Sequence, residues 1–282
     1  MERTTSSDNA PLCGLVLAGG QSKRMGHDKA AVAYQGKPQV EVCFELLQRV
    51  CDSVFVSTRA DQADAPGRKG LPQIHDRFGH IGPMDGILSA FETHPDRAWL
   101  VVACDLPFLN EVTLRILIAQ RDAAKDATAF VSSSDGLPEP LCAIYEPGIR
   151  TKLHALLSQD MRCPRKALIR SDTKLLKLPD ERALDNVNNP EELDAALKAL
   201  STGRKVTINY YAQLREQRGL GEEAVETTAA TARDLYQALR SKHGLQLDPK
   251  HVRVAVNQQV ASWDAPVRAG DRIAFLPPVS GG

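Results

Sequence analysis

A glycine-rich stretch over residues 17–29 combines two features with which proteins bind phosphate groups. It reads Leu-Ala-Gly-Gly-Gln-Ser-Lys-Arg-Met-Gly-His-Asp-Lys and follows directly on an apolar run. Glycines let main-chain N–H groups approach a phosphate, and Lys23, Arg24 and Lys29 add positive charge beside it. The spacing is neither that of a P-loop nor that of a dinucleotide-binding turn. An ordinary strand-to-helix turn would leave the three cations unexplained, so the stretch predicts a site for a nucleotide polyphosphate.

A second polar segment carries a carboxylate that could hold a metal ion at such a site. Asp105 lies in Cys-Asp-Leu-Pro, at residues 104–107, directly after an apolar run. An acidic residue at the end of a buried strand is well placed to hold Mg²⁺ against phosphate oxygens. The alternative is that Asp105 only caps the next helix. Together, the glycine-rich stretch and the carboxylate indicate phosphoryl or nucleotidyl transfer.

Two further groups of side chains admit a functional and a structural interpretation. Arg162, Arg165 and Lys166 could clamp an anionic substrate, and a solvated basic helix face explains them equally well. His75 and His80 could suggest a metal pair, although ordinary loop histidines are the more frequent case.

The composition limits the kinds of partner. The chain has 282 residues, with 35 Lys or Arg and 35 Asp or Glu, so no net charge attracts nucleic acid or an anionic membrane surface. No apolar run is long enough to cross a bilayer, and nothing before the glycine-rich stretch resembles a secretory signal. The six cysteines contain no C-x-x-C pair, which argues against a zinc ribbon. We expect free, mostly buried thiols in a cytoplasmic protein with small-molecule or protein partners.

Alternating strands and helices must position the candidate residues. The run over residues 13–18 is apolar without alternation, which predicts a parallel strand buried on both faces. Further strands are predicted over residues 53–58, 99–104, 127–132 and 141–145. Helices are predicted over residues 40–50, 87–91 and 112–119, from Pro164, and from Asn189 to about Leu200. This order predicts a doubly wound α/β sheet, with the glycine-rich stretch and Asp105 at its carboxyl edge.

The pattern changes after Ser201-Thr202-Gly203. Strands are predicted over residues 205–210, 223–228, 252–257 and 272–276, around one helix that Gly244 closes. Four strands and one main helix predict a small α+β domain. We therefore expect two domains, over residues 1–200 and 204–282.

The first domain resembles the molybdenum cofactor guanylyltransferases, which belong to the Rossmann-like nucleotidyltransferases. Five segments agree in order over about residues 12–200, namely residues 17–29, 82–87, 104–107, 139–145 and 186–193. The resemblance implies attack by the terminal phosphate of molybdopterin on the α-phosphorus of GTP, with pyrophosphate as the leaving group. The pair Gly19-Gly20 resembles the guanylyl branch of the family more than the cytidylyl branch. Use of CTP or of a sugar phosphate is the alternative.

The same resemblance implies roles for individual residues. The main chain of the glycine-rich stretch would hold the nucleotide, Lys29 its phosphates, and Asp105 the Mg²⁺ ion. Arg24 is a further candidate for contact with the triphosphate, on the ground of its charge and not of the resemblance. The predicted catalytic residues are thus Arg24, Lys29 and Asp105. Asn188 is either a second ligand of the metal or substrate, or only an asparagine at a helix start. The implied nucleotide-binding residues are Leu17, Ala18, Gly19, Gly20, Lys29, Thr58, Asp76 and Asp105, where Thr58 stands at the position of an asparagine in many relatives.

The second domain resembles the small sulfur-carrier subunit of molybdopterin synthase, a ubiquitin-like β-grasp protein. The match runs from about Arg204 to the final Pro-Pro-Val-Ser-Gly-Gly. It implies that the carboxylate of Gly282 is adenylylated and becomes a thiocarboxylate, and glycine has no Cβ to obstruct passage through a narrow channel. The implied partners are the large synthase subunit and an activating enzyme. A nucleotide-binding regulator with a ubiquitin-like tag and no transfer activity is the rival interpretation of the whole chain.

Overall fold

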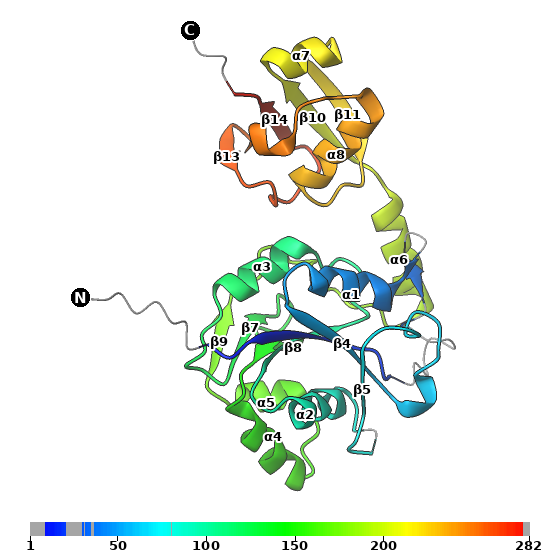
Figure 1. Ribbon diagram of the computed structural model, residues 1–282, viewed down its shortest axis with the longest axis vertical. Coiled ribbons are helices and arrows are strands. Elements are labelled where there is room, and N and C mark those ends of the chain that lie inside the picture. Colours follow the sequence, from blue (N-terminus) through cyan, green and yellow to red (C-terminus); the bar gives the residue numbers. More distant parts are fainter. Residues whose placement is uncertain (1–8, 21–29, 31, 35–36, 80, 279–282) are drawn as a thin grey trace, which may run out of the picture. The chain divides into compact units, whose positions relative to one another are not determined.

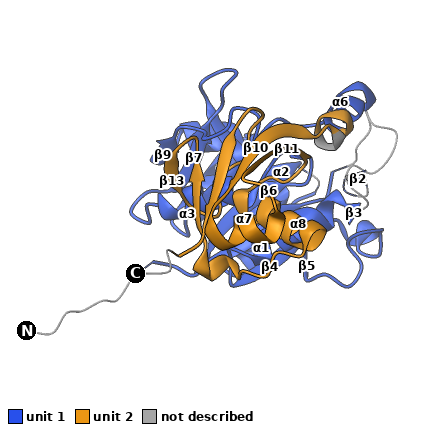
Figure 2. Ribbon diagram, turned by 90° about the horizontal axis from the view of Figure 1, so that it is seen from above, with its two compact units in different colours: residues 1–196 blue, residues 197–282 orange. Residues whose placement is uncertain are grey.

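The computed structural model describes residues 9–20, 30, 32–34, 37–79 and 81–278. The chain forms two compact units, Met1–Ala196 and Leu197–Gly282, which Figure 2 colours separately. The division falls inside helix α6 (Pro190–Ser201), which leads from the first unit into the second. None of the helices formed by the described residues is long and apolar enough to cross a membrane.

The first unit contains a seven-stranded sheet in the order β5-β4-β1-β6-β8-β7-β9. Strand β1 pairs in parallel with both β4 and β6, whereas β8 runs antiparallel to β6 and β7. The reversed direction brings the start of β8 to the edge where the parallel strands end. The strands are β1 (Leu12–Leu17), β4 (Ser53–Thr58), β5 (Gln73–His75), β6 (Ala98–Ala103), β7 (Ala127–Val131), β8 (Pro138–Tyr145) and β9 (Thr173–Leu176), and the short strands β2 (Ala33–Tyr34) and β3 (Lys37–Pro38) form a separate ribbon.

Helices cover both faces of this sheet, as Figure 1 shows. Helices α1 (Gln39–Gln48) and α3 (Glu111–Ala119) pack on one face, where they share an apolar cluster with alternate residues of β1 and β6. Helices α2 (Pro83–Thr93), α4 (Ile149–Ser158) and α5 (Pro164–Ile169) pack on the other. Every residue of β6 is buried, as expected for a central strand between two helical layers. The doubly wound α/β prediction is confirmed, with the reversed β8 as an addition.

The second unit has the ubiquitin-like β-grasp arrangement. Its sheet has the order β11-β10-β14-β12-β13, with β10 and β14 parallel at the centre. Helix α8 (Ala232–His243) begins with a capping box between Thr231 and Asp234 and ends at Gly244, whose φ is 68°. The remaining elements are β10 (Arg204–Tyr210), α7 (Ala212–Arg218), β11 (Glu222–Thr227), β12 (Arg253–Val256), β13 (Gln259–Ala261) and β14 (Arg272–Leu276). The predicted α+β fold of this unit is confirmed.

The cysteine prediction also agrees with the structure. All six thiols are free, and four of them are buried. Cys51 is half-buried and Cys163 is exposed, so burial holds for most of the set but not for all of it.

Candidate functional site

The end of β1 is held between its two neighbouring strands. The Ala18 amide donates to the Ser57 carbonyl at 2.9 Å, and the Cys104 amide donates to the Leu17 carbonyl at 3.3 Å. These bonds continue the β1 pairing beyond the last strand residues. The segment Leu17, Ala18, Gly19 and Gly20 therefore lies at the carboxyl edge of the sheet, where open α/β folds bind ligands. Arg24 and Lys29, which the sequence predicts for the same site, lie outside the described residues.

Asp76 lies directly beside residues 17–20, the described part of the glycine-rich stretch, which we call the glycine segment. Its amide donates to the Thr58 carbonyl at 3.0 Å, and the Ser57 hydroxyl donates to its Oδ1 at 3.0 Å. A Cβ atom placed on Gly19 would lie 2.8 Å from Asp76 Oδ2, so the absence of a side chain permits this approach. The structure thus brings together Gly19, Thr58 and Asp76, which are all predicted nucleotide-binding positions. The Thr58 side chain is fully buried, and its hydroxyl donates to the Arg59 carbonyl at 3.4 Å.

Asp105 is half-buried and lies shortly after the end of β6. Its main-chain carbonyl connects this part of the chain to the segment that precedes α6. The Val187 amide donates to the Asp105 carbonyl at 3.0 Å, which places the segment before α6 beside the end of β6. Asn188 follows in this segment, and its amide donates to Glu192 Oε2 at 2.6 Å. Asn189 caps α6, because its Oδ1 accepts from the Glu192 amide at 2.8 Å. The capping role expected at this helix start thus belongs to Asn189, and Asn188 lies in a segment adjacent to Asp105.

These residues fit a magnesium ion that is bound together with phosphate. Mg²⁺ prefers oxygen ligands and usually takes one or two carboxylates, with the remaining positions filled by waters and phosphate oxygens. Asp105 supplies a carboxylate at the sheet edge where the glycine segment lies, and Asn188 offers a side-chain oxygen in the neighbouring segment. Asp105 and Asn188 would therefore be the residues that hold the ion.

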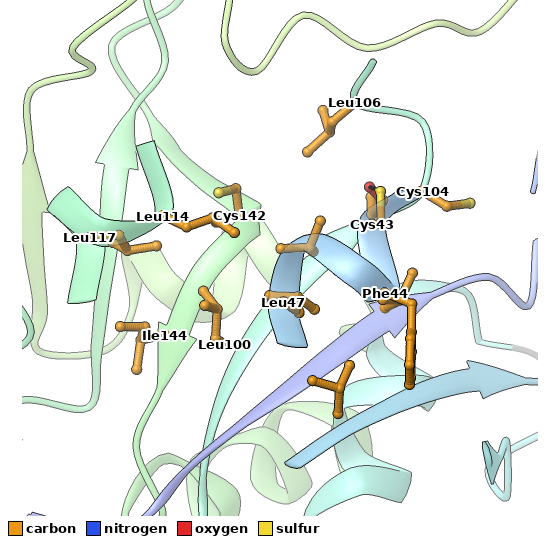
Figure 3. Packing of buried hydrophobic residues seen from close by; sticks show 14 of the residues in the cluster. Cys43, Phe44, Leu47, Leu100, Cys104, Leu106, Leu114, Leu117, Cys142 and Ile144 are labelled. Atoms are coloured by element: carbon orange, nitrogen blue, oxygen red, sulfur yellow. Dashed lines mark hydrogen bonds between the residues drawn. The ribbon is translucent and has the colours of Figure 1, made fainter. Parts of the chain in front are cut away.

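A buried glutamine supports the loop at residues 104–107, which contains Asp105, from inside the protein. Gln39, the first residue of α1, is 3% exposed and donates from Nε2 to the Leu106 carbonyl at 3.3 Å. The same nitrogen lies 3.7 Å from Cys43 Sγ. Burial and the nearby Asp105 carboxylate raise the pKa of the Cys43 thiol to about 12, so this thiol stays protonated at neutral pH. Figure 3 shows Cys43, Cys104 and Leu106 at the same end of the apolar cluster. The sequence offers no sign that Gln39 is buried.

Asp85 and Gly86 hold the first turn of α2 against the site. The Asp85 carboxylate accepts from the amides of Arg77 at 2.8 Å and Phe78 at 3.0 Å, so it fixes the chain directly after Asp76. Gly86 lies so close to β1 and β4 that a Cβ atom would be 2.2 Å from Ser57 Oγ. Neither residue was predicted as functional. Their signal in the sequence is the run Gly-Pro-Met-Asp-Gly at residues 82–86, with proline and an acidic residue in the first helical turn.

Substitution of Gly86 by alanine is expected to lower the free energy of unfolding by about 1–3 kcal/mol, as overpacking commonly does. The new methyl group would displace the Ser57 hydroxyl that binds Asp76 and would also lie 2.7 Å from Leu17 Cδ2. Urea denaturation of the full chain measures the change. Gly148→Ala is the matched control, because its φ of −60° suits alanine and a Cβ there meets no atom within 4 Å. Equal loss of stability in both variants would contradict the close packing assigned to Gly86.

The predicted basic cluster is largely paired with carboxylates. Arg165 contacts Asp135 at 2.7 Å and Glu139 at 3.0 Å, and Arg162 contacts Asp160 at 2.6 Å. Arg165 therefore joins α5 to Asp135 before β8 and to Glu139 within β8. Two carboxylates around one guanidinium leave no net positive charge there, which favours the structural interpretation of this residue. His75 is exposed at the end of β5, and His80 lies outside the described residues.

Comparisons with known proteins found relatives for both units. The family described as MobA-like NTP transferase domain matches residues 14–175, and the ThiS family matches residues 208–282. A molybdenum cofactor biosynthesis bifunctional protein from Synechocystis sp. is 38% identical over 182 residues, which cover 64% of this chain and 52% of that protein. The chain thus spans about half the length of that relative.

Two further relatives are covered over most of their length. A probable molybdenum cofactor guanylyltransferase from Nostoc sp. is 32% identical over 187 residues, which cover 64% of this chain and 88% of that protein. The solved structure of molybdopterin-guanine dinucleotide biosynthesis protein A from Archaeoglobus fulgidus matches with a TM-score of 0.58 at 24% identity. That match covers 67% of this chain and 98% of the archaeal chain, and it shows a shared fold for the first unit.

Proposed function

The chain belongs to the MobA-like NTP transferase family, and on this basis we propose that its first unit transfers GMP from GTP to molybdopterin. An oxygen of the terminal phosphate of molybdopterin attacks the α-phosphorus of GTP. The bond from this phosphorus to the oxygen that bridges to the β-phosphate breaks, and pyrophosphate leaves with the electron pair. Because both reacting groups are phosphates, no covalent intermediate with the protein is required.

The observation that supports this proposal is the meeting of three chain segments at one sheet edge. The glycine segment after β1, Asp76 after β5 and Asp105 after β6 are connected through hydrogen bonds to Ser57 and Cys104. Such an arrangement offers main-chain donors and carboxylates to a nucleotide, and it can act by positioning and charge stabilisation alone.

Each part of the site has a proposed task. The main chain of Ala18, Gly19 and Gly20 binds the nucleotide, and Asp76 orients it. Asp105, with Asn188, holds Mg²⁺, whose chemistry is to neutralise negative charge on phosphate oxygens. Among the residues outside the described part of the chain, Arg24 and Lys29 are proposed to contact the triphosphate.

For the second unit we propose sulfur transport on the C-terminal carboxylate of Gly282. The match to the ThiS family and the β-grasp sheet support this role. Strand β14 is followed by Pro277 and Pro278, which favour an extended departure of the chain from the sheet. The proposed partners are the large subunit of molybdopterin synthase and an enzyme that adenylylates and sulfurates the terminal glycine.

A competition between nucleotides tests the base specificity of the first unit. The full chain is incubated with molybdopterin and Mg²⁺ in the presence of equal concentrations of GTP and CTP, and the dinucleotide products are separated and identified by mass. We expect the guanine dinucleotide to predominate. Predominance of the cytosine product would show a cytidylyltransferase. Pyrophosphate release that requires a sugar phosphate in place of molybdopterin would overturn the proposed substrate.

A further inference from the structure

A fully buried arginine lies directly behind the glycine segment. Arg68 belongs to the long segment between β4 and β5, its side chain has 0% exposure, and its Nη2 donates to the Ala18 carbonyl. Removing a guanidinium from water costs free energy. A buried guanidinium is therefore expected only where its hydrogen bonds compensate for the lost hydration. The position of Arg68 therefore indicates a specific task at the end of β1.

The segment around Arg68 is anchored firmly enough to carry such a task. The Gln73 side chain donates to the carbonyls of Arg68 and Ala63, both at 2.9 Å. Gly67 has a φ of 78°, and a Cβ atom on it would lie 2.7 Å from Val40 Cγ1 and 2.9 Å from Pro38 Cβ. Arg68 thus extends from a segment that is packed against the start of α1.

The bond from Arg68 determines how the next amide is directed. In a trans peptide the carbonyl oxygen and the following N–H group point in opposite directions. Because Arg68 holds the Ala18 carbonyl toward the interior, the Gly19 N–H points away from it. Together with the bonds from Cys104 to Leu17 and from Ala18 to Ser57, this contact fixes both peptide groups that follow β1.

We infer that Arg68 is a positioning residue for nucleotide binding, acting through the Ala18–Gly19 peptide. This inference rests on the proposed function, because it assigns a task to a residue that supports the same site. Arg68 itself does not need to touch the nucleotide. Loss of the Arg68 side chain leaves the Ala18–Gly19 peptide free to rotate. Nucleotide binding then has to order this peptide, and the lost conformational entropy weakens the affinity.

The opposite end of β1 offers a matched control. Arg121 is also largely buried and donates from Nη2 to the Ala10 carbonyl at 2.8 Å, just before β1. It also forms two hydrogen bonds with the Glu146 carboxylate, at 2.7 and 2.8 Å. Arg68 and Arg121 therefore hold carbonyls at the two ends of one strand, and only the first of these ends carries the site.

The experiment compares Arg68→Met, Arg68→Lys and Arg121→Lys in the full chain. Titration calorimetry with GTP and Mg²⁺ gives the Kd, steady-state pyrophosphate release gives KM and kcat, and thermal denaturation gives Tm. We expect Arg68→Met to raise Kd and KM for GTP about tenfold, as loss of a hydrogen bond from a charged group does, and to leave kcat at saturating GTP within about twofold. Arg68→Lys keeps the charge but not the guanidinium fork, so its rise is smaller. Arg121→Lys lowers Tm without changing Kd.

Three results would overturn the inference. An unchanged Kd for GTP in a folded Arg68→Lys or Arg68→Met protein would contradict the positioning role. If Arg68→Met does not fold, the Kd of Arg68→Lys is the deciding measurement. If the Kd for GTP rises in Arg121→Lys in proportion to its loss of Tm, the weaker binding of the Arg68 variants would be explained by lower stability of the fold. Binding of neither GTP nor CTP by the wild type would overturn both the inference and the proposed function. If the wild type binds only CTP, the base assignment fails, and the same comparison with CTP decides the role of Arg68.

Discussion

Asp105→Ala is expected to lower the rate of GMP transfer about a hundredfold or more, the scale on which loss of one group that stabilises transition-state charge is felt. The fold should persist, because the loop is held by main-chain bonds that the variant keeps. The Val187 amide binds the Asp105 carbonyl, and Gln39 binds the carbonyl of Leu106. Asp105 is half-buried at the carboxyl edge of the sheet, where open α/β folds bind ligands.

The rate is measured as pyrophosphate release from GTP in the presence of molybdopterin and Mg²⁺, and Tm reports on the fold. Asp172→Ala is the control, because Asp172 precedes β9 at the opposite edge of the sheet and pairs with Lys125 on the surface. An exposed ion pair of this kind contributes at most about 1 kcal/mol to stability. Near wild-type turnover in Asp105→Ala, at an unchanged Tm, would contradict the assignment of Asp105 to the metal and phosphate site.

Addition of one residue after Gly282 is expected to abolish thiocarboxylate formation. The sulfur would be carried on the main-chain carboxylate of Gly282, so an added residue converts that carboxylate into an amide. Intact mass after incubation with ATP, a sulfur donor and the activating enzyme measures the exchange of one oxygen for sulfur.

GMP transfer serves as the internal control for this variant, since the glycine segment, Asp76 and Asp105 all belong to the first unit. Its rate should be unchanged. Sulfur gain by the extended chain would contradict the assignment of the sulfur to the Gly282 carboxylate. Loss of GMP transfer in the extended chain would show that the two units do not have the separate tasks proposed for them.

Elements with a strong local pattern could be predicted from the sequence, and elements that depend on distant partners could not. The central strands β1 and β6 are apolar runs, and β4 has an apolar centre. The predicted positions of all three agree with the structure to within one residue. Strands β5, β9 and β13 have three or four residues each, too few to show a period of their own. The reversed direction of β8 has no local signal either, because alternation along a strand is the same in both directions.

The same distinction applies to the site. Gly19 and Asp105 stand in recognisable motifs, and Asp76 is implied only by the family resemblance. The structure brings all three to one edge of the sheet. Arg68 and Gln39 lie in segments without such motifs, and each binds a carbonyl far away in the sequence, at separations of 50 and 67 residues. A buried polar side chain can be identified only when its partner is known. Residues that support a site from behind are therefore the ones that sequence patterns miss.

Formation of a dinucleotide from GTP and molybdopterin is the activity proposed for the first unit. Its most direct test follows the α-phosphate: the full chain is incubated with molybdopterin, Mg²⁺ and GTP labelled at the α-phosphorus, and the products are separated. We expect the label to appear in a molybdopterin guanine dinucleotide, with one pyrophosphate released for each label transferred. Binding of labelled GTP without transfer of the label, in a protein that Tm shows to be folded, would contradict it and would favour a nucleotide-binding regulator.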